Sequence, residues 1–252
     1  MASLRERLHA GERLLGTFVK SPDPSVAELL GDSGLDFLLA DYEHSSLSVG
    51  EVESIARAVT VPVVVRLSSD SIADAGRLLD SGASGLQVAD VHAVATAADA
   101  CARARYPPAG RRGLAFSHRA ARFGREPRAA HLARSAAELL VICQIESSEG
   151  IAALPELLVA GLEVDAWFLG PTDLSASLRL GGNTGHAAVQ DALTSAADAI
   201  LGAGARLGIY ASDARAARAW ADRGATFIAV GSDYTLLAAR IDEIVSDWRS
   251  AG

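Results

Sequence analysis

The segment Leu35-Asp36-Phe37-Leu38-Leu39-Ala40-Asp41-Tyr42-Glu43-His44 joins a short apolar run directly to a group of ionisable side chains. The apolar residues 37–40 predict a short, fully buried strand. Two acids and a histidine follow at the point where that strand ends. Because α/β folds place their functional groups at the carboxyl ends of parallel strands, the segment predicts an α/β protein with Asp41, Glu43 and His44 at the rim of its sheet.

Apolar, β-branched runs of the same kind recur along the chain and alternate with helical patterns. The predicted strands cover residues 14–18, 37–40, 61–65, 85–88, 140–145, 166–169, 206–209 and 226–230. Eight strands, each followed by a helix, over about 250 residues are typical of a (β/α)₈ TIM barrel. The alternative is a doubly wound sheet, which would need a phosphate-binding glycine fingerprint after its first strand, and residues 16–22 contain none. We therefore expect a single barrel domain over residues 1–252.

Local signals predict where some of the helices begin. Asp23-Pro24 places an N-cap residue before a proline, and Ser48-Val49-Gly50-Glu51 has the pattern of a capping box. One connection, Tyr106–Ser135, is too long for a simple barrel unit. It is a candidate functional loop or partner-binding arm.

Composition limits the kinds of partner. Half of the 252 residues are hydrophobic and 21% are charged, which is usual for a folded domain with a large core. The net charge of −8 argues against a nucleic-acid or membrane partner and favours a small molecule. Residues 1–7 form no apolar signal region, and Cys101 and Cys143 are expected as buried structural thiols. A reducing, cytoplasmic location is therefore expected.

In a barrel, the side chains that follow the strands converge on one pocket. The polar residues in these positions are Asp41, Glu43, His44, Arg66, Gln144, Glu146 and those of Gly170-Pro171-Thr172-Asp173. Glu146 and Asp173 lie after neighbouring strands, and two carboxylates completed by waters and substrate oxygens suit Mg²⁺ or Mn²⁺. The alternative is structural: Glu146 would pair with an arginine and Asp173 would cap the helix that begins there.

His44 is the candidate general base, because carboxylates one and three residues before it could fix its tautomer. Its alternative role is a structural hydrogen bond. Arg66 follows a very apolar strand, which indicates an oxyanion or carboxylate partner, or else a salt bridge to Glu43 or Glu146. Lys20 is the only lysine and is expected as a solvated residue at the rim, so a Schiff-base mechanism would have to use it. Four further histidines are expected at the surface: His9, His92, His131 and His186.

Six motifs occur in the order found in the HpcH/HpaI aldolase family, which the chain resembles from about residue 14 to 240. They are Gly16-Thr17-Phe18-Val19-Lys20, Asp41-x-Glu43-His44, Val65-Arg66, Tyr106-Pro107-Pro108-x-Gly110-Arg111-Arg112-Gly113, Gln144-Ile145-Glu146 and Gly170-Pro171-x-Asp173-Leu174-Ser175. The family comprises class II, metal-dependent pyruvate aldolases, such as 4-hydroxy-2-oxoheptanedioate aldolase and 2-dehydro-3-deoxyglucarate aldolase.

The resemblance implies a divalent metal and a substrate site. Glu146 and Asp173 would bind Mg²⁺ or Mn²⁺, with Co²⁺ as a further candidate, and Gln144 would line the same site. Beyond Gly170, the amides around Thr172 and Asp173 would bind the carboxylate of pyruvate.

The resemblance also implies roles in catalysis and assembly. Arg66 would hold the keto oxygen and stabilise the enolate, while His44, oriented by Asp41, would move protons through water. Members of the family are typically hexamers that exchange a C-terminal helix, which corresponds here to Tyr234–Arg249. Asp80 matches a position that reaches toward the site of a neighbouring subunit.

Two departures from the family pattern bear on the substrate. Tyr42 stands where many members have a small residue, and it could narrow the pocket or reach a subunit interface. Gln87-Val88-Ala89-Asp90 lacks a proline that members often have after this strand. Glu43 is expected to bridge to Arg66 or to a water on the metal.

The activity implied by the resemblance is reversible cleavage of a 4-hydroxy-2-oxo acid into pyruvate, or a close 2-oxo acid, and an aldehyde. A second hypothesis keeps the enolate but uses it for oxaloacetate decarboxylation or for a condensation in specialised metabolism. A third is a non-catalytic barrel that binds a small acid.

Overall fold

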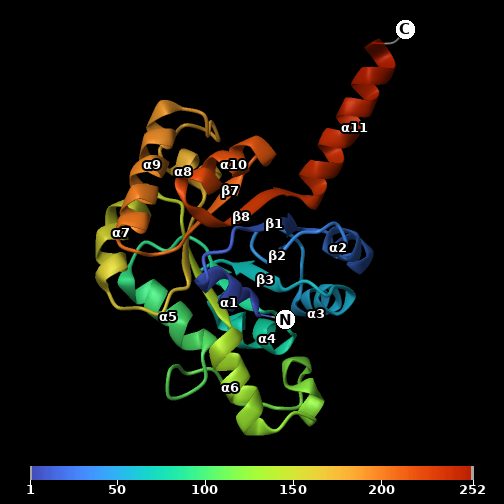
Figure 1. Ribbon diagram of the computed structural model, residues 1–252, viewed down its shortest axis with the longest axis vertical. Helices are drawn as coiled ribbons and strands as arrows, with labels where there is room; N and C mark the ends of the chain where they lie inside the picture. The colour runs from blue at the N-terminus through green and yellow to red at the C-terminus, as the bar shows by residue number, and fades with distance from the viewer. Residues whose placement is uncertain (1, 251–252) are drawn as a thin grey trace.

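The computed structural model describes residues 2–250, which form a closed barrel of eight parallel strands surrounded by helices (Figure 1). The strands are β1 (Leu14–Val19), β2 (Phe37–Asp41), β3 (Val63–Leu67), β4 (Gly85–Val88), β5 (Leu140–Ile145), β6 (Ala166–Leu169), β7 (Leu207–Ala211) and β8 (Ala225–Ser232). Each strand pairs with the next, and β8 closes onto β1. The predicted (β/α)₈ barrel is therefore confirmed.

One helix precedes the first strand, and at least one helix follows each strand around the barrel. The helices are α1 (Leu4–His9), α2 (Pro24–Gly31), α3 (Val49–Ala58), α4 (Ala75–Asp80), α5 (Val94–Ala104), α6 (Arg128–Glu138), α7 (Ser148–Val159), α8 (Pro171–Ser177), α9 (Ala187–Gly202), α10 (Ala214–Arg223) and α11 (Asp233–Ser250), with short 3₁₀ turns η1 (Ile72–Asp74) and η2 (Arg119–Gly124). Asp23 caps α2, and Ser48 caps α3 in a complete capping box with Glu51. Both predicted N-caps are confirmed.

The barrel has an inner and an outer apolar layer. Phe37, Phe168 and Phe227 belong to the inner layer, where the rings of Phe37 and Phe227 stack with centroids 3.9 Å apart. Gly16 leaves room for the Phe37 ring, because a Cβ atom at this position would overlap it. The outer layer lies between the strands and the helices and includes the expected buried thiols, Cys101 and Cys143.

The segment predicted as one long connection is partly helical. Helix α6 begins at Arg128, because residues 128–138 include five alanines and two arginines, which favour helix, and directly follow Pro127. The connection Tyr106–Ser135 is therefore not a loop throughout, because its residues 128–135 belong to α6. The surface position predicted for His131 is also wrong: it lies on the inner face of α6, and its Nε2 is 3.1 Å from the Tyr106 hydroxyl.

The last helix, α11, leaves the body of the barrel and projects away from it (Figure 1). It corresponds to the helix predicted for residues 234–249. Its large apolar side chains are exposed, up to 83% for Trp248. Among residues 2–250, no helix is long and apolar enough to cross a membrane.

Candidate active site at the carboxyl ends of the strands

The interior of the barrel changes from apolar to polar near the carboxyl ends of its strands. Side chains alternate between the two faces of a strand, so residues two apart face the same way. Phe37 and Leu39 of β2 lie in the inner layer, and Asp41 continues their row. Val64 of β3 is followed in the same way by Arg66, and the strand register places Asp41 beside Arg66. Gln87 and Gln144 are buried at neighbouring positions.

Asp41 is fully buried and its carboxylate is saturated with partners. Arg66 donates Nε to Oδ1 (3.0 Å) and Nη2 to Oδ2 (2.7 Å). The Lys20 ammonium lies 3.0 Å from Oδ2, and the backbone N–H of His44 donates to Oδ1 (3.1 Å). Burial by itself would raise the pKa of Asp41, but the hydrogen bonds and charge of Arg66, with help from Lys20, bring that pKa below its usual value.

The alternative of a salt bridge between Arg66 and Glu43 is confirmed, with Nε and Oε2 3.5 Å apart, but the main partner of Arg66 is Asp41, which was not predicted. One expectation is wrong. Lys20 is not a solvated rim residue: its side chain is 27% exposed, pairs with Asp41 and donates to the His44 carbonyl (3.3 Å).

The ring of His44 faces Glu43 rather than Asp41. The His44 side chain is half exposed, and its Nε2 lies 3.8 Å from Oε2 of Glu43. Burial raises the pKa of Glu43, although the charges of Arg66 and His44 act in the opposite direction. Asp41 therefore orients His44 through its backbone, and the imidazole has a different carboxylate neighbour.

Across the barrel mouth, Glu146 is buried among amide groups. Its Oε1 accepts the Asp90 N–H (2.8 Å), its Oε2 accepts a hydrogen bond from Gln144, and Gln144 in turn accepts one from Gln87. Gly170 is required beside it, because a Cβ atom there would lie 2.7 Å from Glu146 Oε2.

The environment of Glu146 fits a cation. Burial, followed by the negative charge of Asp173, raises its pKa to about 8, so the pair lacks compensating positive charge. Within residues 2–250 neither carboxylate forms a salt bridge, which disfavours the alternative pairing of Glu146 with an arginine. Asp173 lies in the first turn of α8, where Gly170 is the N-cap, so it is not the cap residue.

The donor set suits a hard divalent ion that also binds water and substrate. No group of three or more His, Cys, Asp or Glu side chains suited to a metal occurs in the described part of the chain. Glu146 and Asp173 would supply two carboxylate ligands. Mg²⁺ and Mn²⁺ are usually held by one or two carboxylates, with waters and substrate oxygens as the other ligands.

A cavity of about 500 Å³ opens between these two groups of residues. Its polar lining includes Lys20, His44, Arg66, Gln144, Thr172, Asp173, Tyr210, Ser232, Tyr234 and Thr235. The two tyrosines were not predicted. Tyr210 falls in β7, one residue beyond the predicted end of that strand, so the alternation of inward and outward positions could have identified it.

The two departures from the family pattern have local structural explanations. The Tyr42 hydroxyl donates to Asp74 Oδ2 (3.0 Å), so the ring points toward η1 and does not line the cavity. Ala89 donates its N–H to Leu67 (2.9 Å), a hydrogen bond that proline could not make.

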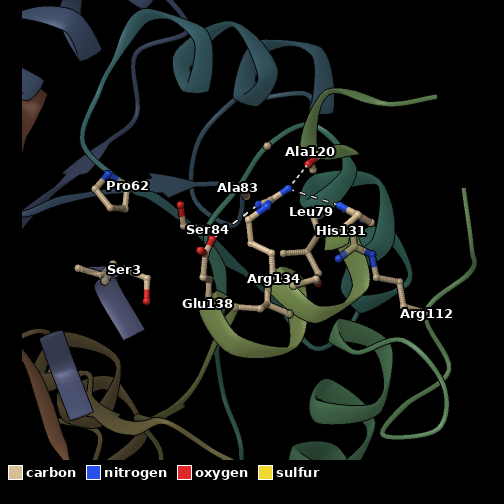
Figure 2. Close-up of a pocket in the computed structure, with 14 residues that line it drawn as sticks. Ser3, Pro62, Leu79, Ala83, Ser84, Arg112, Ala120, His131, Arg134 and Glu138 are labelled. Atoms are coloured by element: carbon tan, nitrogen blue, oxygen red, sulfur yellow. Dashed lines mark hydrogen bonds and ion pairs between the residues drawn. The ribbon is translucent and has the colours of Figure 1, made fainter. Parts of the chain in front are cut away.

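Asp80 lies far from these residues in its own subunit. It ends α4 and pairs with Arg112 (2.6 Å) and His118 (3.3 Å). A second cavity, of about 230 Å³, lies nearby at the amino ends of the strands, where Pro62 and Ser84 line it (Figure 2). In its wall, Arg134 contacts the Ala120 carbonyl, His131 and Glu138 (Figure 2).

The fold and the layer of charged groups indicate a (β/α)₈-barrel protein with a candidate active site at the carboxyl ends of the strands. The sequence matches the HpcH/HpaI aldolase/citrate lyase family over residues 14–239, and the chain belongs to this family of carbon–carbon lyases.

Curated relatives and a solved structure agree with this assignment. The chain is 35% identical over 250 residues to a hydroxypyruvate/pyruvate aldolase of Pseudomonas aeruginosa, covering 97% of this chain and 92% of the relative. It is 38% identical over 242 residues to a 4-hydroxy-2-oxo-heptane-1,7-dioate aldolase of Salmonella typhimurium, covering 94% and 90%. A crystal structure of an HpcH/HpaI aldolase/citrate lyase family protein from Burkholderia cenocepacia superposes with a TM-score of 0.90 at 32% identity, covering 98% of each chain.

Proposed function

We propose that the protein is a divalent-metal-dependent aldolase that reversibly cleaves a 4-hydroxy-2-oxo acid into pyruvate, or a close 2-oxo acid, and an aldehyde. The observation that carries this proposal is the pair of uncompensated carboxylates, Glu146 and Asp173, beside a cavity that Arg66 also lines. The names of the two relatives support the same chemistry.

The main demand of the reaction is to stabilise an enolate. When held by Glu146 and Asp173, Mg²⁺ or Mn²⁺ would supply Lewis acidity worth several kcal/mol. Arg66 is fixed by Asp41 and would donate to the oxygen on which negative charge develops. The backbone amides of Thr172 and Asp173, next to Gly170, would bind the substrate carboxylate, with Gln144 lining the site.

His44 would transfer protons during the reaction. Breaking the C3–C4 bond requires removal of the proton from the C4 hydroxyl, and the enolate later takes up a proton at C3. The imidazole lines the cavity and is partly solvated, so it can exchange protons with water. General acid–base help of this kind contributes about 10²–10⁴-fold.

Chelation is the direct test of the proposal. Treatment with a chelator is expected to abolish aldol cleavage, and Mn²⁺ or Mg²⁺, with Co²⁺ as a further trial, should restore it. Borohydride added with pyruvate should leave no adduct on Lys20, since its ammonium is paired with Asp41. A trapped lysine adduct, or full activity in the chelated protein, would contradict the proposal. Mass spectrometry of the Lys20 peptide provides the readout.

We also propose a homohexamer, or trimer of dimers, in which α11 is exchanged between subunits. An apolar groove of about 470 Å³ lies beside β1 and β8, where Leu30, Leu35 and Ala217 contribute to its walls. The exposed apolar side chains of α11 match such a groove. In this assembly Asp80, which is remote from the site of its own subunit, would serve a neighbour.

Changing one exposed residue on α11 tests the exchange. Trp248→Glu is expected to shift the sedimentation coefficient to that of a smaller species, because it places a charge in the proposed interface. Asp247→Asn on the same helix is the matched control and should sediment like the parent. An unchanged coefficient for Trp248→Glu would contradict the exchange of α11.

A further inference from the structure

Two carboxylates lie beside Arg66, those of Asp41 and Glu43, and Glu43 is the one without a close partner. Its side chain is 15% exposed, and its buried Oε2 forms no hydrogen bond within residues 2–250. The nearest nitrogen atoms of ionisable side chains are Arg66 Nε at 3.5 Å and His44 Nε2 at 3.8 Å. A buried oxygen without a partner is costly, so its presence calls for a physical reason.

Asp41 cannot supply the carboxylate that the imidazole needs. Each carboxylate oxygen has about two acceptor sites. Oδ1 of Asp41 accepts from Arg66 and from the His44 backbone, while Oδ2 faces Arg66 and Lys20. With these sites occupied, no room is left for a hydrogen bond from the His44 ring.

We propose that Glu43 is the positioning residue of His44: its carboxylate holds the Nε2 proton of the imidazole and stabilises the imidazolium formed during the reaction. This inference rests on the proposed aldolase function and assigns the partner of its base. With Nε2 protonated toward Glu43, Nδ1 is left free to act as the base.

The proton balance is simple. In cleavage, Nδ1 takes the proton of the C4 hydroxyl, the C4–O bond becomes the aldehyde carbonyl, and the electrons of the C3–C4 bond form the enolate. The imidazolium then returns that proton to C3 and gives pyruvate. The ionisable groups around Glu43 are Arg66, His44, Asp41, Asp173 and Glu146. Of these, His44 is the one that would gain a positive charge during turnover.

Exchange of the C3 hydrogens of pyruvate with deuterium, followed by NMR in the Mg²⁺-loaded enzyme, isolates this step from the aldehyde. Glu43→Gln keeps the size of the side chain and removes its charge. The exchange rate is expected to fall by about 10- to 10²-fold, within the contribution of general acid–base catalysis. The rise of the rate with pH should also move to lower pH, since the imidazolium loses a negative neighbour.

Two further variants separate positioning from a general structural effect. Glu43→Asp should recover part of the exchange rate and of its pH profile. In a His44→Ala background, Glu43→Gln should cause no further loss of the exchange rate. Glu28→Gln, a surface change on α2, is the matched control and should behave like the parent.

The outcomes distinguish this inference from the proposed function. If the parent enzyme neither exchanges pyruvate hydrogens nor cleaves the aldol with Mg²⁺, the aldolase proposal itself fails. If the parent exchanges but Glu43→Gln leaves the rate and the pH profile unchanged, the assignment of Glu43 is overturned. An equal loss in the His44→Ala background would also overturn it. Should Glu43→Gln fail to fold, the shift in the pH profile of Glu43→Asp decides.

Discussion

Replacing Glu146 with glutamine is expected to lower aldol turnover by about 10³-fold or more, because it removes an ionised ligand from a site whose Lewis acid supplies several kcal/mol. Glutamine has the same shape and can still accept the Asp90 N–H, so the barrel should fold. Calorimetric titration with Mn²⁺ should show the loss of metal binding directly. Glu149→Gln, an exposed change a few residues along, is the matched control.

The same variant should be at least as stable as the parent when no metal is present. The pKa of Glu146 rises from 4.5 to about 8 on folding, so the folded protein holds a proton that the unfolded chain releases. The stability of the metal-free parent is therefore greatest below pH 4.5 as far as this group is concerned, and is lost as the pH rises toward 8. Denaturant unfolding from pH 5 to 8 should show this slope in the parent but not in Glu146→Gln. Identical slopes would show that Glu146 is not the group responsible.

Arg66→Met should reduce both stability and activity. The side chain is 9% exposed, makes two hydrogen bonds to a fully buried carboxylate, and lies over the Phe18 ring at 4.6 Å. Breaking a buried ion pair from one side costs about 3–5 kcal/mol, and the low end is expected because Lys20 still pairs with Asp41. Loss of a donor to the enolate should also lower turnover by about 10²–10³-fold.

A second substitution separates these two effects. Asp41→Asn combined with Arg66→Met removes the unpaired charge and should recover much of the free energy of unfolding, but not the turnover. Arg77→Met, which removes an exposed arginine from α4, is the control and should change neither quantity appreciably. Recovery of turnover in the double variant would contradict a direct role of Arg66 in catalysis.

The sequence predicted the barrel well because its strands are almost entirely apolar and its helix starts carry strong capping signals. It predicted the pairing at the site less well. The third strand was expected to begin at Val61, but Pro62 has no N–H to donate and only its carbonyl takes part, accepting the Leu38 N–H (3.0 Å), so β3 begins at Val63. The register places Asp41 beside Arg66, and this pairing was missed because the partner of Arg66 lies 25 residues earlier on another strand.

Side-chain direction accounts for the remaining differences. Tyr42 directly follows Asp41 in the sequence, but it lies just beyond the end of β2 and its side chain reaches Asp74 outside the cavity. Lys20 appeared to be a solvated residue because a buried carboxylate from another strand cannot be recognised as its partner from local sequence. Burial of His131 depends in the same way on Tyr106, 25 residues earlier.

The first residue of α11 contacts residues at the mouth of the barrel, so the position of this helix affects the candidate site. Asp233 accepts the backbone N–H groups of Lys20 (2.9 Å) and Ser21 (2.8 Å), and Lys20 contacts Asp41. In the proposed hexamer, displacement of α11 on dissociation would disturb the contacts of Asp233 with Lys20 and of Lys20 with Asp41. Specific activity should then depend on protein concentration and decline on dilution over the range in which the subunits separate.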